Sequence, residues 1–90
     1  MYKLQIRSRA EKVLNKLSIR DRKRIIEAIL QLKDNPRPKG YEKLVNDIYR
    51  IRIGDYRVIY LIDDVTRLVD IGKVARRRER TYKDLEKLFK

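Results

Sequence analysis

The chain has 90 residues and carries 25 Lys or Arg against 13 Asp or Glu, which gives a formal net charge of +12. It contains no Cys and no His, so disulfide and thiolate chemistry are excluded, and the usual general base of serine-type catalysis and the usual zinc ligand are missing. No apolar run approaches the ~18 residues that a membrane-spanning helix needs. The length fits a single domain over residues 1–90. The excess of positive charge makes nucleic acid the first expected partner and an acidic protein the second.

The first predicted element is a strand. Tyr2, Leu4 and Ile6 alternate with polar residues, and a period of two is typical of a strand with one buried face. This start does not have the pattern of a signal peptide. Together with the absence of Cys, it favours a cytoplasmic protein.

Two short amphipathic helices are predicted next. Ser8 and Glu11 have the spacing of a capping box, and the apolar residues that follow predict a first helix over about residues 9–17. Ser18 opens a second helix, which stops at Asn35-Pro36. We expect the two helices to form an antiparallel hairpin that covers one face of a sheet.

A β-hairpin is predicted over residues 49–60, with Gly54-Asp55 as its two-residue loop. In this register Arg52 faces Arg57, and Arg50 lies two residues back on the same face. The opposite face is apolar and consists of Tyr49, Ile51, Ile53, Tyr56, Val58 and Tyr60. One face of the hairpin should therefore pack in the core, while the other presents guanidinium groups.

The pairing of Arg52 with Arg57 has a cost. Like charges directly opposite each other destabilise a sheet, so the arrangement needs a reason beyond folding. An anionic ligand such as a phosphodiester backbone supplies one. The alternative is that these arginines form a solvated outer face that keeps the sheet soluble.

A third strand follows over about Thr66 to Val74 and completes an antiparallel meander. Asp63-Asp64, which precedes it, is the best pair of candidate metal ligands in the chain. Asp is also common in turns because of its local hydrogen bonds, and this turn interpretation is favoured. We therefore expect neither a metal nor another cofactor.

A basic block, Arg76 to Arg80, comes after the third strand. It reaches the end of the same sheet, so it should converge with the arginines of the hairpin; the alternative is a solvated charge run. The last predicted element is a short helix that begins near Tyr82 and has a narrow apolar stripe of Leu85, Leu88 and Phe89. Tyr82 itself is either a functional phenol or a core contact.

The chain resembles the RelE toxin family, the ribosome-dependent messenger-RNA endonucleases of toxin–antitoxin modules, over nearly its whole length. The similarity is most specific over residues 49–60, YRIRIGDYRVIY. It implies an α+β fold with an N-terminal strand, an antiparallel helical hairpin packed on a small antiparallel sheet, and a short final helix. It also implies that Arg57 is catalytic, and that Arg50 and Arg52 take the places of two catalytic basic residues, which are lysines in the best-known member. Arg keeps its proton at accessible pH, so these positions can stabilise charge but cannot act as the base.

A second signature of this family is a Gly followed closely by a basic pair and by a Tyr about four residues after the Arg. Residues 72–82 are similar to it. Counting back from Tyr82 selects Arg78, and the resemblance implies that both are catalytic; Arg76 and Arg77 remain alternatives for the late arginine. The cations around them are expected to bind RNA, namely Lys73, Arg76, Arg77 and Arg80.

The implied reaction is a transesterification that uses no metal, in which the ribose 2′-hydroxyl attacks the adjacent phosphate in the ribosomal A site. The implied partner is an acidic, RelB-like antitoxin that folds on binding. Two alternatives stay open. The first is a ParE-type toxin that shares the fold and poisons gyrase, and the second is a basic RNA- or ribosome-binding module without activity.

Overall fold

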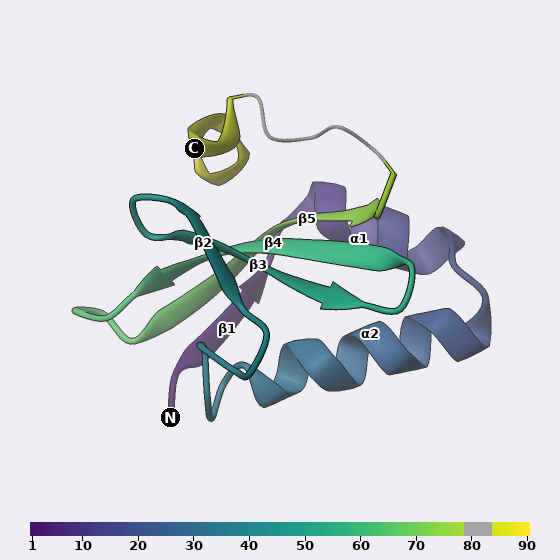
Figure 1. Cartoon of the computed structure of the whole chain (residues 1–90), viewed down its shortest axis with the longest axis horizontal. Helices are drawn as coiled ribbons and strands as arrows, with labels where there is room; N and C mark the ends of the chain where they lie inside the picture. Colours follow the sequence, from purple (N-terminus) through teal and green to yellow (C-terminus); the bar gives the residue numbers. More distant parts are fainter. Residues whose placement is uncertain (79–83) are drawn as a thin grey trace.

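Five strands form one sheet in the order β1-β5-β4-β3-β2 in the computed structural model, which describes residues 1–78 and 84–90. Two helices lie on one side of this sheet, and a short 3-10 helix lies on the other (Figure 1). The elements in chain order are β1 (Lys3–Ile6), α1 (Ser8–Lys16), α2 (Ile19–Gln31), β2 (Glu42–Val45), β3 (Ile48–Ile53), β4 (Tyr56–Asp63), β5 (Leu68–Arg76) and the 3-10 helix η1 (Leu85–Phe89). The predicted α+β architecture is confirmed.

The central hairpin has the predicted register. Strands β3 and β4 pair antiparallel, with Arg52 opposite Arg57 and Tyr49 opposite Tyr60. Gly54 has a φ of 58° in the loop between them, a left-handed conformation that Gly adopts without steric cost. The turn therefore sets which residues face each other, and the alternation of side chains sets which face each residue occupies.

Two features of the sheet differ from the prediction. Residues Glu42–Val45 form the additional edge strand β2, which pairs with β3. Strand β1 pairs with β5 in parallel, with Leu4 opposite Val69, whereas the prediction gave this strand neither a neighbour nor a direction. Alternation of apolar residues identifies the two faces of a strand but carries no information about its neighbour or direction, so this pairing had no local signal.

The main core lies between the helices and the sheet. Its buried residues from the helices are Ala10, Leu14, Ile25 and Ile29, and these pack against inward-facing residues of β3, β4 and β5 that include Ile51, Val58, Tyr60, Val69 and Ile71. The apolar face predicted for the hairpin is thus the face that the helices cover. No helix in the described part of the chain has both the length and the apolar character needed to cross a membrane.

The helix starts show one correct and one wrong prediction. Ser18 caps α2, because its Oγ accepts a hydrogen bond from the backbone N–H of Asp21 at 3.2 Å. The prediction of a capping box between Ser8 and Glu11 is wrong. Helix α1 begins at Ser8 itself, its N-cap residue is Arg7, and no side chain caps it.

A smaller apolar cluster lies on the other face of the sheet. There η1 places Leu85 against the buried residues Ile48 and Ile59, and Leu61, Leu88 and Phe89 pack around them. The predicted final helix is therefore present, as a 3-10 helix that begins at Leu85. Tyr82, where the sequence placed its start, lies outside the described residues.

Candidate nucleic-acid interface

The face of the sheet opposite α1 and α2 carries the side chains of Arg50 and Arg52 from β3 and of Arg57 from β4, and we call it the arginine face. Arg52 is exposed and lies directly opposite the half-buried Arg57. Lys73 pairs with Ile59 across β4 and β5, so alternation places the half-buried Lys73 on this face as well. The structure therefore brings these four predicted cations onto one surface.

An acidic residue offsets the charge of Arg50. Its Nη2 donates a hydrogen bond to Oε2 of Glu42 and forms an ion pair with it, at the point where β2 and β3 place the two residues opposite each other. The side chain of Arg50 is only 11% exposed, and that of Glu42 is 56% exposed. Sequence reasoning missed Glu42 because it did not predict β2.

The late basic block begins at the end of β5, next to the hairpin loop. The backbone N–H of Arg77 donates to the carbonyl of Asp55 at 2.7 Å, and a cavity of about 350 Å³ is lined by Asp55, Arg76, Arg77 and Arg78. The guanidinium of Arg76 lies 5.6 Å from the ring centroid of Tyr56, a core residue on the helix side of the sheet. Arg76 thus faces away from the arginine face.

Arg80 and Tyr82, which were also predicted as site residues, lie outside the described residues. A further cation that the sequence did not reveal reaches the hairpin loop from α2. The Nη1 atom of Arg24 lies 2.8 Å from where a Cβ on Gly54 would be, so the guanidinium rests on the glycine itself. Only the absence of a side chain at Gly54 allows this approach, and no local pattern in α2 distinguishes Arg24 from its basic neighbours.

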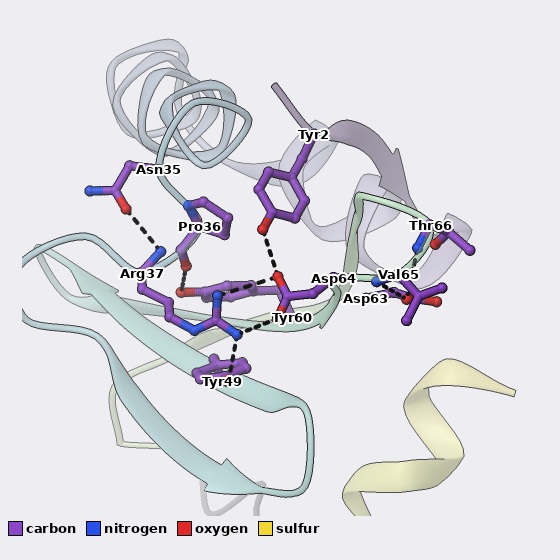
Figure 2. A network of polar contacts seen from close by, with 10 residues as sticks. All are labelled: Tyr2, Asn35, Pro36, Arg37, Tyr49, Tyr60, Asp63, Asp64, Val65 and Thr66. Carbon is purple, nitrogen blue, oxygen red and sulfur yellow. Dashed lines mark hydrogen bonds and ion pairs between the residues drawn. The ribbon is translucent and has the colours of Figure 1, made fainter.

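A separate polar network has a structural role (Figure 2). Arg37 Nη2 donates to Tyr49 Oη at 3.1 Å and to Asp64 Oδ2 at 2.9 Å, and Tyr2 Oη donates to Asp64 Oδ1 at 2.6 Å. These donors, Arg37 foremost, lower the pKa of Asp64. Tyr60 donates to the carbonyl of Pro36 at 2.7 Å, and burial raises the pKa of its phenol. The network ties the loop after α2 to the sheet.

The turn interpretation of Asp63-Asp64 is confirmed. Asp63 Oδ1 accepts hydrogen bonds from the backbone N–H groups of Val65 at 3.0 Å and Thr66 at 3.1 Å, which lower its pKa, that of Thr66 most. The carboxylate of Asp64 accepts hydrogen bonds from Arg37 and Tyr2. Among residues 1–78 and 84–90, no group of three or more Asp or Glu side chains is arranged to hold a metal ion.

The sequence is similar to known toxins along most of its length. A sequence model of the family described as the ParE toxin of the type II toxin–antitoxin system parDE matches residues 4–81. A curated relative from Methanocaldococcus jannaschii that carries the name RelE1 toxin is 36% identical over 88 residues, which cover 92% of this chain and 97% of the relative.

Solved structures with the same fold include toxins bound to their antitoxins. The archaeal RelE–RelB complex from Pyrococcus horikoshii matches with a TM-score of 0.81 and 31% identity, and covers 89% of this chain and 98% of that one. The RelBE2 toxin–antitoxin complex from Mycobacterium tuberculosis matches with a TM-score of 0.74 and 28% identity, over 84% of this chain and 98% of that one. The intact RelBE complex of E. coli gives a TM-score of 0.75 at 25% identity, over 89% and 100%.

Proposed function

We propose that this chain, which belongs to the RelE/ParE superfamily of toxins from type II toxin–antitoxin systems, is an endoribonuclease that cleaves messenger RNA on the ribosome. It would act in the cytoplasm, where translation takes place. The substrate is the messenger in the ribosomal A site, and the reaction is a transesterification within the RNA itself.

One observation carries the proposal. Arg52 and Arg57 lie directly opposite each other across the β3–β4 ladder, although like charges in that position destabilise a sheet. Lys73, in the neighbouring strand, adds a further cation to the same face. A phosphate group bound between these side chains would convert the repulsion into attraction, and arginines bind phosphate oxygens through paired hydrogen bonds.

The chemistry that fits this surface is charge stabilisation. The 2′-hydroxyl loses its proton, O2′ forms a bond to phosphorus, the bond from phosphorus to O5′ breaks, and O5′ takes up a proton. The products are a 2′,3′-cyclic phosphate and a new 5′-hydroxyl. Negative charge grows on the non-bridging oxygens in the transition state, where Arg57 and Arg52 would stabilise it, with Arg78 as the late arginine. Arg50, held by Glu42, would add positive charge beside the same oxygens from β3 without a direct contact to the phosphate.

The proton-transfer roles must belong to other groups, because arginine stays protonated at accessible pH. We assign them to Tyr82 or Lys73, whose phenol and amine can lose a proton. Arg76, Arg77 and Arg80 would bind RNA phosphates other than the one that reacts. Splayed bases stack on tyrosine rings in RNA recognition, which is a second role open to Tyr82.

An acidic, RelB-like antitoxin is the proposed protein partner. The solved relatives from P. horikoshii, M. tuberculosis and E. coli are a RelE–RelB complex and two RelBE toxin–antitoxin complexes. The net charge of +12 favours an acidic chain, and the arginine face offers it the same cations that RNA would use.

Mapping of RNA 5′ ends after brief induction tests the proposal. New ends should appear within translated codons within minutes of expression without a partner. Growth that stops while the messages stay intact would contradict the nuclease assignment.

The second candidate is inhibition of gyrase, and the match of residues 4–81 to the ParE toxin family favours it. The arginine face argues against it, because gyrase inhibition does not require cations placed to stabilise a phosphorane. DNA damage after induction, with intact messages, would identify this candidate. Growth arrest with neither cleavage nor DNA damage would instead identify a non-catalytic RNA- or ribosome-binding module.

A further inference from the structure

Arg7 is the last residue before α1, and its side chain contacts β5 instead of capping the helix. Its Nε lies 3.2 Å and 3.1 Å from the two carboxylate oxygens of Asp70, and its Nη2 lies 2.9 Å from Oδ2. Asp70 is only 4% exposed. Several charge-assisted hydrogen bonds to a buried carboxylate fix the plane of the guanidinium.

The other edge of the same guanidinium binds the end of η1. Nη2 donates to the carbonyl of Phe89 at 2.8 Å, and Nη1 donates to the main-chain oxygen of Lys90 at 3.0 Å. Carbonyls in the last turn of a helix lack partners within it, and a cation there is favourable. Arg7 therefore joins β5 to the end of η1.

The apolar side of η1 fits a specific place on the sheet. Gly72 lies where the β4–β5 register shifts, and a Cβ there would lie 2.6 Å from ring atoms of Phe89. The ring thus occupies the space that a side chain would fill. On the side toward β2 the contact is open, because a cavity of about 570 Å³ there is lined by residues that include Leu44, Val45 and Leu85. Arg9 donates to the carbonyl of Leu88 at 3.3 Å, so Arg7 and Arg9 both bind main-chain oxygens of η1, and Arg7 alone of the two is also held by Asp70.

We propose that Arg7 and Asp70 are a positioning pair, which holds η1 on β5 and thereby fixes the strand beside Lys73. This inference rests on the proposed function. The ring of Phe89 packs on Gly72, the residue before Lys73 on β5, so the position of η1 affects where this candidate proton-transfer group lies. A misplacement of a reacting group by ~1 Å can cost roughly 10²-fold in rate.

Two substitutions test the pair. Arg7→Gln removes the donors to Asp70, Phe89 and Lys90, and Asp70→Asn keeps the shape while it removes the charge. Each should lower the single-turnover rate on programmed ribosomes by about 10-fold or more through lost positioning, with little change in the ribosome concentration at half-saturation. The double variant should cleave no more slowly than the less active of the two single variants, because the two residues act as a unit. Arg7→Lys should recover part of the rate, since Lys supplies the charge without the planar fork.

Amide hydrogen exchange at residues 85–89 is the readout that does not depend on catalysis. Both Arg7→Gln and Asp70→Asn should accelerate it, and Lys12→Gln, which removes one exposed positive charge from α1, should leave exchange and rate as in the parent. Parental cleavage rates in the presence of accelerated exchange would overturn the positioning role. Unchanged exchange would show that the pair does not hold η1. A parent protein that cleaves no message contradicts the proposed function instead, and the exchange data still decide whether the pair holds η1.

Discussion

Glu42 and Arg50 form an ion pair across β2 and β3, at positions that lie opposite each other in the ladder. The pair places one acidic residue beside the arginine face, where it offsets the charge of the most buried of the three arginines. Arg50 is thereby held within the sheet, while Arg52 remains exposed.

Glu42→Gln should make Arg50 available to RNA. One additional phosphate contact steepens the log–log dependence of single-strand affinity on salt by about 0.7. The fold should lose about 1 kcal/mol, a value between those of exposed and buried ion pairs. Salt titrations and chemical denaturation measure the two effects. Glu27→Gln removes an equal charge from an exposed site on α2, and an identical salt slope for both variants would show that Glu42 does not restrain Arg50.

Arg57→Ala should abolish cleavage and leave the fold intact. Its side chain lies on the face away from the main core, so the free energy of unfolding should change by about 1 kcal/mol or less. Loss of a group that stabilises transition-state charge costs about 10²-fold or more in rate. Circular dichroism and single-turnover cleavage measure both quantities, with Arg20→Ala on α2 as the control for lost charge. A fully active variant would show that the arginine face only binds RNA.

The pH profile of the cleavage rate should show no titration of a protein group near neutral pH. The chain contains no His, and the ordinary pKa values of phenols and amines lie near ~10, so the rate should still rise above pH 7. Single-turnover rates from pH 6 to 9 measure it. A limb centred near ~6.5 that survives Tyr82→Phe would assign the base to the RNA or the ribosome.

Asp64→Asn should change the acid stability of the fold. Hydrogen bonds from Arg37 and Tyr2 lower the pKa of Asp64, so its carboxylate stabilises the fold above the unfolded-state value of about 4, and this contribution is lost as the pH falls through the folded pKa. The difference in unfolding free energy between parent and variant should therefore be constant from pH 7 to 5 and shrink below about pH 4. Urea denaturation at several pH values measures it. A difference that persists at pH 2, or an equal effect of Asp34→Asn, would contradict the assignment.

The hairpin was predictable because its signals are local. Gly54-Asp55 defines the loop, and the alternation around it determines both the register and the opposed pair Arg52 and Arg57. Ser18 is likewise a local signal, because a cap acts within three residues.

The features that the sequence did not reveal depend on distant contacts. Strand β2 is a short edge with mostly exposed residues, so its pattern resembles a loop, and the partner of Arg50 was hidden with it. The role of Arg7 could not be predicted from its neighbours in the sequence. Its partner Asp70 and the main-chain oxygens at the end of η1 are 63 to 83 residues away. The direction of β1 depends in the same way on β5.

Cleavage of a defined message by the purified protein, with and without ribosomes stalled at a known codon, shows whether the protein is a ribosome-dependent endoribonuclease. We predict a single cut within the A-site codon that leaves a 2′,3′-cyclic phosphate, appears only when ribosomes are present, and disappears with Arg57→Ala. An uncut message on programmed ribosomes would show that the protein is not this endoribonuclease, and equal cutting of free RNA would show that it does not need the ribosome.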